Sequence, residues 1–268
     1  MKSKLYVIAV ISLLLVGCTN PYAKFYQDRT GGVDIMKSPR VIVPTDKPQL
    51  FRGGDPDVDY FRMLENGFGL IGFSSFNGSD NINVNAALEQ ATKVHASVAL
   101  VYSKYTNTVS GSVPLTLPDT QTSTTTLSGD VVGPGGTASY SGSAYSTTYG
   151  TRTTYMPYSV NRYDYFASYW IKLKPLVFGV HVRELSAELK QKIGSNKGVV
   201  VIAVVKGSPA FAADILRGDI LKRIGDQEVL DPKAFSEATS KYAGKKVTVI
   251  FLRDGKEFTK EILFNERT

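Results

Sequence analysis

Hydrophobic and polar positions follow a strand-and-turn pattern in the C-terminal third of the chain, from about Lys174 to Phe264. Val199–Val205 is a continuous, mostly β-branched run, and Gly207-Ser208-Pro209 stops it, as expected where a strand ends and a helix begins. Asp231-Pro232 predicts a helix start, with Asp as N-cap and Pro at the first helical position. These elements predict a small sheet with helices packed on it.

Two further patterns support this sheet. The helix that starts at Pro232 is expected to run to about Tyr242, with Ala243-Gly244 closing it. Asp254-Gly255 separates two alternating runs, Lys246–Arg253 and Lys256–Phe264, which is a strong signal for a β-hairpin. One face of the helix carries apolar or small residues at three- and four-residue spacing: Phe235, Ala238, Thr239 and Tyr242.

The middle of the chain predicts a second folded unit. Asp55-Pro56 opens a helix that runs to about Glu65. Phe68–Phe76 is then typical of a buried strand, Asn81–His95 of a helix, and Ala96–Tyr105 of another strand. This order predicts a βαβ unit with a right-handed crossover.

Residues 106–160 are rich in Ser, Thr, Gly and Tyr. Val113, Leu115 and Leu117 alternate with other residues, and five tyrosines recur on the far side among β-branched threonines, which favour strands. We therefore expect a long, partly polar β-ribbon with a mobile tip near 119–139. A disordered loop is the alternative, because low complexity of this kind is also typical of flexible linkers.

The N-terminus has the features of a secretory signal. Lys2 and Lys4 precede an apolar run, Leu5–Val16, that is too short to span a bilayer stably. The run ends Leu15-Val16-Gly17-Cys18, which resembles the bacterial lipobox. That resemblance implies cleavage before Cys18 and attachment of diacylglycerol and an N-acyl chain, such as palmitate, to this only cysteine of the chain. Thr19, in place of Asp, then suggests the outer membrane; a free buried cysteine is the alternative.

Charge and composition offer little chemistry. The net charge is +7, and removal of residues 1–17 would leave 29 bases against 24 acids, without a basic cluster interleaved with aromatics. We therefore expect no nucleic-acid partner. The only histidines, His95 and His181, lack the spacing of a metal site or a catalytic triad, and no nucleophile turn of the G-x-S-x-G kind occurs. We predict no metal, no cofactor and no enzymatic activity.

The C-terminal motifs resemble a known family. Leu176–Val182, Gly207–Ala210 and Ile215–Leu221 are similar to the PDZ family, specifically to the bacterial kind found in HtrA-family proteases. The resemblance implies a Φ-Gly-Φ loop whose backbone N–H groups receive a terminal carboxylate, and a following strand that pairs with the ligand as an added strand. It implies these peptide-binding residues: Phe178, Gly179, Val180, His181 and Val182 on the loop and strand, and Phe235, Ala238, Thr239 and Tyr242 on the helix.

One departure leaves part of this function open. The loop Val177–Val180 lacks the second glycine of many PDZ domains, so the requirement for a free C-terminus stays open. Lys172 and Lys174, just upstream, would add attraction for a carboxylate if they face the groove; an ordinary solvated linker is the alternative.

Together these patterns predict an α+β protein. It has an N-terminal α/β block with a long β-ribbon, followed by a C-terminal PDZ-like β-sandwich or barrel with capping helices. The predicted function is a non-catalytic, lipid-anchored envelope protein, facing the periplasm, that binds C-terminal or extended segments of envelope proteins by strand addition. The alternative is a structural or assembly component whose central domain oligomerises while the PDZ-like domain only docks. The predicted boundaries are a signal peptide at 1–17, a lipidated N-terminus and extended tether at 18–49, an α/β domain with the ribbon at 50–172, and a PDZ-like domain at 174–268.

Overall fold

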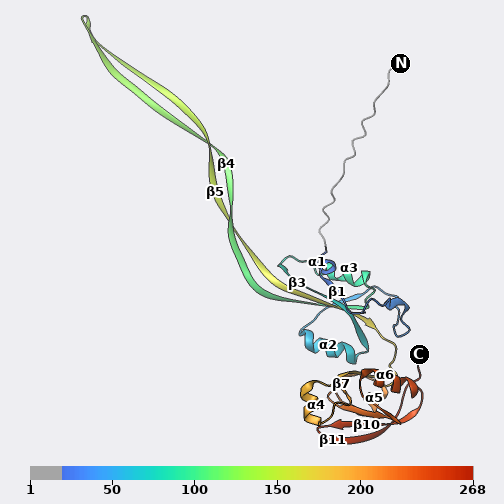
Figure 1. The fold of residues 1–268 in the computed structure, drawn as a ribbon. Helices are drawn as coiled ribbons and strands as arrows, with labels where there is room; N and C mark the ends of the chain where they lie inside the picture. Colours follow the sequence, from blue (N-terminus) through green and yellow to red (C-terminus); the bar gives the residue numbers. More distant parts are fainter. Residues whose placement is uncertain (1–19, 268) are drawn as a thin grey trace, which may run out of the picture. The chain divides into compact units, whose positions relative to one another are not determined.

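The computed structural model describes residues 20–267. The predicted signal peptide and Cys18 therefore lie outside the described residues. The chain forms two compact units, one made by 105–163 and the other by the remainder of the chain on either side of it. The larger unit contains two sheets, and the smaller one is a β-ribbon (Figure 1).

The first sheet has the strand order β1-β3-β5-β4-β2. β2 runs parallel to β4, and β1 runs antiparallel to β3. Buried side chains that include Tyr169 and Trp170 form its core. Its strands are β1 (Tyr26–Asp28), β2 (Gln49–Arg52), β3 (Phe68–Ser79) and the ends of β4 (Val98–Gly133) and β5 (Gly136–Lys172); its helices are α1 (Pro21–Lys24), the 3₁₀ turn η1 (Ile35–Lys37), α2 (Pro56–Glu65) and α3 (Asn85–Lys93).

The predicted strand–helix–strand order is present as β3-α3-β4, with β5 inserted between the two strands. The Leu173 N–H donates to Gly67 near the start of β3, and Asn77 near the end of β3 bonds Asp164. β5 therefore runs antiparallel to β3. The sequence indicates a returning aromatic strand at Tyr163–Trp170, but not its position between β3 and β4, because this segment follows the whole ribbon in sequence.

The extended tether predicted for 18–49 is corrected for its described part. Tyr22 is fully buried in the core of the first sheet, and β1 pairs with β3. Asn20 caps α1 by accepting the N–H groups of Tyr22 and Ala23, and its own side chain donates to Ala86. The prolines of this segment suggested a linker, but its aromatic residues supply core contacts instead, such as the edge-on packing of Tyr22 against Phe76 at 5.0 Å.

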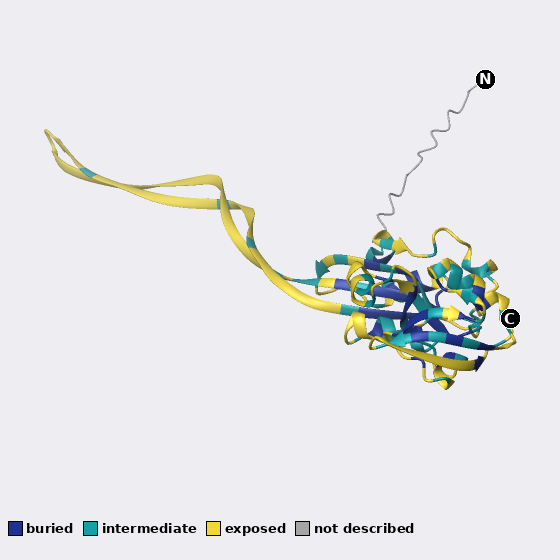
Figure 2. Ribbon diagram, turned by 60° about the horizontal axis from the view of Figure 1, so that its bottom comes forward, coloured by how far each residue is buried: buried dark blue, intermediate teal, exposed yellow. Residues whose placement is uncertain are grey.

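The second unit, 105–163, consists of the ribbon portions of β4 and β5 joined by a turn at Pro134 and Gly135. Side-chain hydrogen bonds join the two strands in one unbroken antiparallel register: Thr108 with Asn161, Ser110 with Ser159, Thr116 with Thr153, and Thr122 with Thr147. Nearly all of these residues are exposed (Figure 2). The ribbon was predicted; the tip 119–139 has strand on both sides of the turn, and its mobility stays a prediction.

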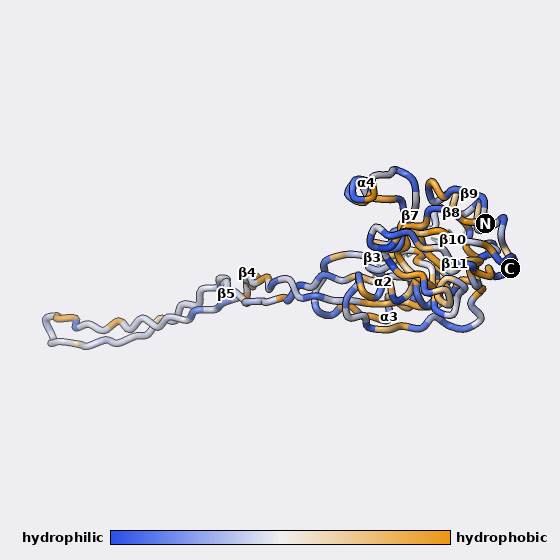
Figure 3. The backbone as a smooth tube through the Cα atoms, turned by 90° about the horizontal axis from the view of Figure 1, so that it is seen from below, coloured by the Kyte–Doolittle hydropathy of each residue, from blue (hydrophilic) through white to orange (hydrophobic). Residues whose placement is uncertain are grey.

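The second sheet has the order β11-β10-β8-β7-β6, with β9 paired to β8. Its end strands β6 and β11 do not pair with each other, so the sheet is open and the barrel alternative in the prediction is corrected. Hydrophobic stretches concentrate in its inner strands (Figure 3). The elements are β6 (Val180–Glu184), α4 (Ala187–Ile193), β7 (Val199–Val204), α5 (Pro209–Ala212), β8 (Ile220–Ile224), β9 (Gln227–Glu228), α6 (Pro232–Lys241), β10 (Lys246–Arg253) and β11 (Lys256–Leu263).

The local signals of this segment are confirmed. Asp231 caps α6 by accepting the Ala234 N–H, and β10 pairs with β11 in register around Asp254 and Gly255. Both turn residues have positive φ, 51° and 76°, which is the requirement of a type I′ hairpin turn. The mixed α/β architecture of the chain therefore agrees with the sequence prediction.

Candidate functional site

The segment before β6 is held by its carbonyl groups. Leu176 and Val177 accept hydrogen bonds from the side chain and backbone of Asn265, both at 2.9 Å. Phe178 accepts from Ala210 at 3.0 Å, and Gly179 from Val205 at 2.8 Å. Four consecutive carbonyl oxygens are thus tied to the body of the domain, which fixes the loop 176–179 in one orientation.

The N–H groups of this loop remain open. Within residues 20–267, the backbone N–H groups of Phe178 and Gly179 donate to no partner. Adjacent unused N–H groups on a curved backbone form a nest that suits an anion. The structure therefore presents, at the predicted Φ-Gly-Φ position, the donors that a carboxylate needs.

β6 continues this open surface as an edge strand. The Val205 N–H bond to Gly179 makes Val180 and Val204 a non-hydrogen-bonded pair, so the N–H and C=O of Val180 point away from β7. Val182 faces Val201, whose own N–H and C=O both bond the turn before β8, so the backbone polar groups of Val182 also point outward. The pairing register shifts between His181 and Val182, where β7 carries one extra residue, Ile202.

A cavity of about 470 Å³ lies between β6 and α6. This volume falls in the range of small-ligand and peptide sites, roughly 300–1,000 Å³. Seven of the nine predicted peptide-binding residues line it: Phe178, Gly179, Val180, His181, Val182, Phe235 and Thr239. We call this cavity the groove.

Two predicted residues lie elsewhere. Ala238 is fully buried in the core of the second sheet. Tyr242 packs over Gly225, and its hydroxyl bonds Asp226. Both sit on the helical face that the spacing identified, but this face packs mainly on the sheet, and only its edge borders the groove.

Gly179 is required by both its conformation and its packing. Its φ is +90°, and a Cβ built on it would lie 2.0 Å from the Ser208 Cβ. Ser208 caps α5 by accepting the Phe211 N–H and also donates to the Gly179 carbonyl. The loop therefore sits directly on the start of α5.

The side walls of the groove differ in polarity. On α6, Ser236, Thr239 and Ser240 contribute hydroxyl groups; those of Thr239 and Ser240 donate back to helix carbonyls. On β6, burial lowers the pKa of His181 from its usual value of 6.5, and its buried Nε2 has no hydrogen-bond partner among the described residues. A ligand lying in the groove would therefore meet hydroxyl groups on one side and a neutral imidazole on the other.

Sequence reasoning missed several lining residues. Arg40 and Arg267 line the groove together with Lys174. The sequence had indicated Lys174, with Lys172, as a residue that would attract a carboxylate if it faced the groove. Lys172, marked in the same way, instead bonds the Asn66 carbonyl and stacks over Phe68. No local signal points to Arg40, because only its long-range pairing beside Leu173 brings it to the site.

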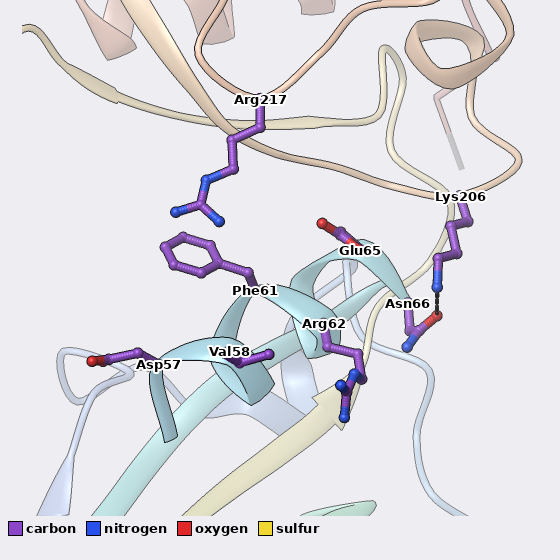
Figure 4. Close-up of a pocket in the computed structure, with 8 residues that line it drawn as sticks. All are labelled: Asp57, Val58, Phe61, Arg62, Glu65, Asn66, Lys206 and Arg217. Carbon is purple, nitrogen blue, oxygen red and sulfur yellow. Dashed lines mark hydrogen bonds between the residues drawn. The ribbon is translucent and has the colours of Figure 1, made fainter. Parts of the chain in front are cut away.

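A second cavity, of about 520 Å³, lies between α2 and the loops of the second sheet (Figure 4). The Arg217 guanidinium stacks over Phe61 with its central carbon 3.5 Å from the ring centroid, and Lys206 bonds Asn66 at 3.2 Å. Asp57 and Glu65 add negative charge to the same opening. Arg217 thus packs between elements, and the Arg217–Asp219 turn has a structural role.

Two other features concern metal binding and membrane crossing. Residues 20–267 contain no group of three or more His, Cys, Asp or Glu side chains arranged to hold a metal ion. No helix in the same range combines the length and apolar character that a bilayer crossing needs.

Similarity to known proteins is concentrated in the C-terminal segment that carries the groove. Among curated proteins, none matches the chain. Among solved structures, the HtrA-type protease AlgW with a decapeptide is similar over 34% of this chain and 29% of its own, with 28% identity and a TM-score of 0.30. The HtrA3 PDZ domain bound to a phage-derived ligand is similar over 33% of this chain and 83% of its own, with 19% identity and a TM-score of 0.30. The family model described as the PDZ domain matches residues 177–263, so this segment of the chain is a PDZ domain.

Proposed function

We propose that this protein is a lipid-anchored, non-catalytic component of the bacterial cell envelope that binds partner proteins through its PDZ domain. The ligand is a C-terminal or extended segment that adds to β6 as a further antiparallel strand. In PDZ domains this mode of recognition gives affinity through main-chain hydrogen bonds and specificity through pockets for alternate side chains.

The observation that carries the proposal is the open edge of β6 beside the groove. Val180 and Val182 direct backbone donors and acceptors outward, and the N–H groups of Phe178 and Gly179 lack partners within residues 20–267. Unpaired edge groups next to a cavity of about 470 Å³ provide both the ladder and the side-chain space that an added strand requires.

The test is binding of a random heptapeptide library displayed with free carboxyl ends to the full chain in detergent. We expect selected peptides to bind in the micromolar range, or about −8 kcal/mol. Ser236→Trp, which places a large ring in the groove, should abolish this binding. Glu237→Trp, one position along α6 and exposed, is the matched control and should leave it intact. If no peptide binds more tightly than about 1 mM, strand addition is not the function.

The anchoring part of the proposal rests on the N-terminal sequence alone. Lys2, Lys4 and the apolar run to Val16 precede the lipobox-like Leu15–Cys18. Mass spectrometry of the mature protein should find Cys18 as the first residue, carrying acyl chains, in outer-membrane fractions. A mature chain that begins at Met1 would refute the anchor.

The absence of catalysis is proposed on the distribution of reactive side chains. His95 follows α3 in a turn with φ of 56°, and His181 lies on β6 in the second sheet. No serine or cysteine nucleophile motif accompanies either histidine in the sequence. Incubation of the full chain with unfolded casein should release no peptides. Peptide release, by the unmodified chain or by its Ser208→Ala or Ser236→Ala variant, would refute the absence of catalysis.

A second candidate function is assembly through the ribbon. The register places Val113 opposite Met156, and both are 56% exposed, with Leu115, Leu117 and Tyr158 on the same face. An isolated two-stranded ribbon is only marginally stable in water, so an exposed apolar face favours a covering partner. The ribbon sequence also has few charges to prevent edge pairing: Asp119, Asp130, Arg152 and Arg162.

Sedimentation velocity distinguishes the two candidates. If the ribbon assembles the protein, full-length chain carrying Cys18→Ser should form oligomers at micromolar concentration. Replacing Val113, Leu115 and Leu117 by Thr should then dissociate them, whereas Thr→Val changes at exposed positions of the opposite face should not. A monomer at about 100 μM would remove the assembly function, because a strand-length interface of standard size is expected to bind more tightly than that.

A further inference from the structure

Every charged residue that lines the groove is a cation. Arg40, Lys174 and Arg267 line it, and no Asp or Glu does. Arg40 and Arg267 are exposed, and Lys174 is half-buried. Within residues 20–267, no carboxylate forms an ion pair with any of the three. We call these three residues the cationic collar.

The collar comes from outside the PDZ domain. The segment that matches the family model is 177–263, and the groove residues within it are apolar or neutral. Arg40 precedes this segment by more than a hundred residues, Lys174 lies just before it and Arg267 just after it. The charge of the groove is therefore a property of this chain and is added to the domain by its neighbouring segments.

Arg40 is held at the groove by its backbone. Its carbonyl accepts the Lys174 N–H at 2.9 Å, and the next residues bridge Leu173 and Lys172. Val41 is buried at 7% exposure in the core of the first sheet. Because backbone bonds and a buried neighbour fix this position, the Arg40 side chain is free to serve a ligand and a change to it should leave the fold intact.

We propose that the groove selects acidic chain ends, and that the collar residues Arg40, Lys174 and Arg267 set this preference. This inference rests on the peptide-binding function proposed above. The N–H groups of Phe178 and Gly179 suit the terminal carboxylate. The three collar cations around the same opening, which form no ion pair within residues 20–267, favour further negative charge. The ligand class is therefore a peptide with a free C-terminus and at least one Asp or Glu among its last three residues.

The physical basis is electrostatic complementarity at an exposed rim. Exposed ion pairs contribute about 0.2–1 kcal/mol each, so removal of one collar cation should weaken binding by about threefold and removal of two by about tenfold. The effect should shrink at 1 M salt, where the Debye length falls to about 3 Å. An amidated peptide should lose more, because a hydrogen bond to a charged group is stronger than one to a neutral group.

The experiment selects the random heptapeptide library described above on the full chain and on Arg40→Gln/Arg267→Gln. We expect Asp and Glu to be enriched in the last three positions for the unmodified chain and not for the double variant. The selected heptapeptide should bind most tightly as the free acid, more weakly with its acidic residue changed to the corresponding amide, and most weakly with its C-terminus amidated. Arg52→Gln, which removes an exposed cation of β2 that does not line the groove, is the control and should bind like the unmodified chain.

The outcomes separate the inference from the function on which it rests. If no peptide is selected, the peptide-binding function fails. If peptides bind but show no acidic enrichment, and Arg40→Gln/Arg267→Gln binds them within twofold of the unmodified chain, the collar has no role and strand addition stands. Equal loss for Arg52→Gln would show a general charge effect and would also overturn the collar.

Discussion

Gly179 offers the most demanding test of the loop geometry. Replacement by Ala forces a residue with a Cβ to adopt φ of +90° and places that Cβ 2.0 Å from the Ser208 Cβ. The unfavourable backbone conformation costs about 1–3 kcal/mol. Moving Ser208 adds an overpacking cost of about 1–3 kcal/mol. We expect Gly179→Ala to destabilise the PDZ domain by about 2–6 kcal/mol in total.

A double-mutant cycle separates these two costs. Ser208→Gly removes the clashing Cβ and, because Gly is a tolerable N-cap, should by itself destabilise by only about 1 kcal/mol. In the Gly179→Ala/Ser208→Gly protein the steric part disappears and the backbone part remains. The two changes should therefore be less than additive by about 2 kcal/mol.

Hydrogen exchange followed by mass spectrometry on the full chain measures both quantities. Amides of β7 and β8 report the opening of the PDZ domain, and amides of β3 in the first sheet are an internal control that should not change. Additivity within about 0.5 kcal/mol would refute the steric contact between Gly179 and Ser208. The same cycle shows that a Gly179 variant is unsuitable as a binding test, because it alters the loop itself.

Three further predictions address burial, pH and the ribbon. Asp219 is 1% exposed and accepts two hydrogen bonds from Arg253. Asp219→Ala should lower the free energy of unfolding by about 3 kcal/mol or more, measured by hydrogen exchange of the β10 amides. A loss under about 1 kcal/mol would contradict a structural ion pair. Burial lowers the His181 pKa in the folded chain, so the unfolded chain binds the proton more readily. The contribution of His181 to the free energy of unfolding should therefore be fully present above pH 6.5 and be lost as the pH falls below it. His181→Phe should flatten this pH dependence, measured by urea unfolding. The Tyr158 ring covers Gly111 on the facing strand, so Tyr158→Ala should speed amide exchange in the ribbon. Tyr149 is 83% exposed, and Tyr149→Ala should leave this exchange unchanged.

The sequence predicted the PDZ domain well because its signals are local. Asp231-Pro232 starts α6, and Asp254-Gly255 forms the hairpin turn with both residues at positive φ. These residues act through their own conformational preferences, so neighbouring sequence is enough to place them. The ribbon was predictable for a similar reason, since alternation and β-branched residues favour strands wherever the chain runs.

The remaining features depend on contacts between distant segments. β5 inserts between β3 and β4 although the ribbon separates it from both in sequence. Tyr22 was assigned to a tether because prolines surround it, yet its ring is buried in the first sheet. Ala238 and Tyr242 share the predicted helix face, but spacing alone does not show which part of a face borders a cavity. In each case the outcome depends on tertiary packing, which periodicity does not encode.

Contacts between distant segments also determine how the groove binds a ligand. Asn265, which follows the family segment, ties the Leu176 and Val177 carbonyls. The cations of the groove come from Arg40, Lys174 and Arg267, all beyond that segment. A fragment that begins at Lys174 would keep the Gly179 loop but lose the Arg40 carbonyl that accepts the Lys174 N–H. We infer that the domain supplies the strand edge while the flanking segments supply orientation and charge. Affinity in the full chain should therefore exceed that of the fragment by about the contribution of one collar cation, roughly threefold.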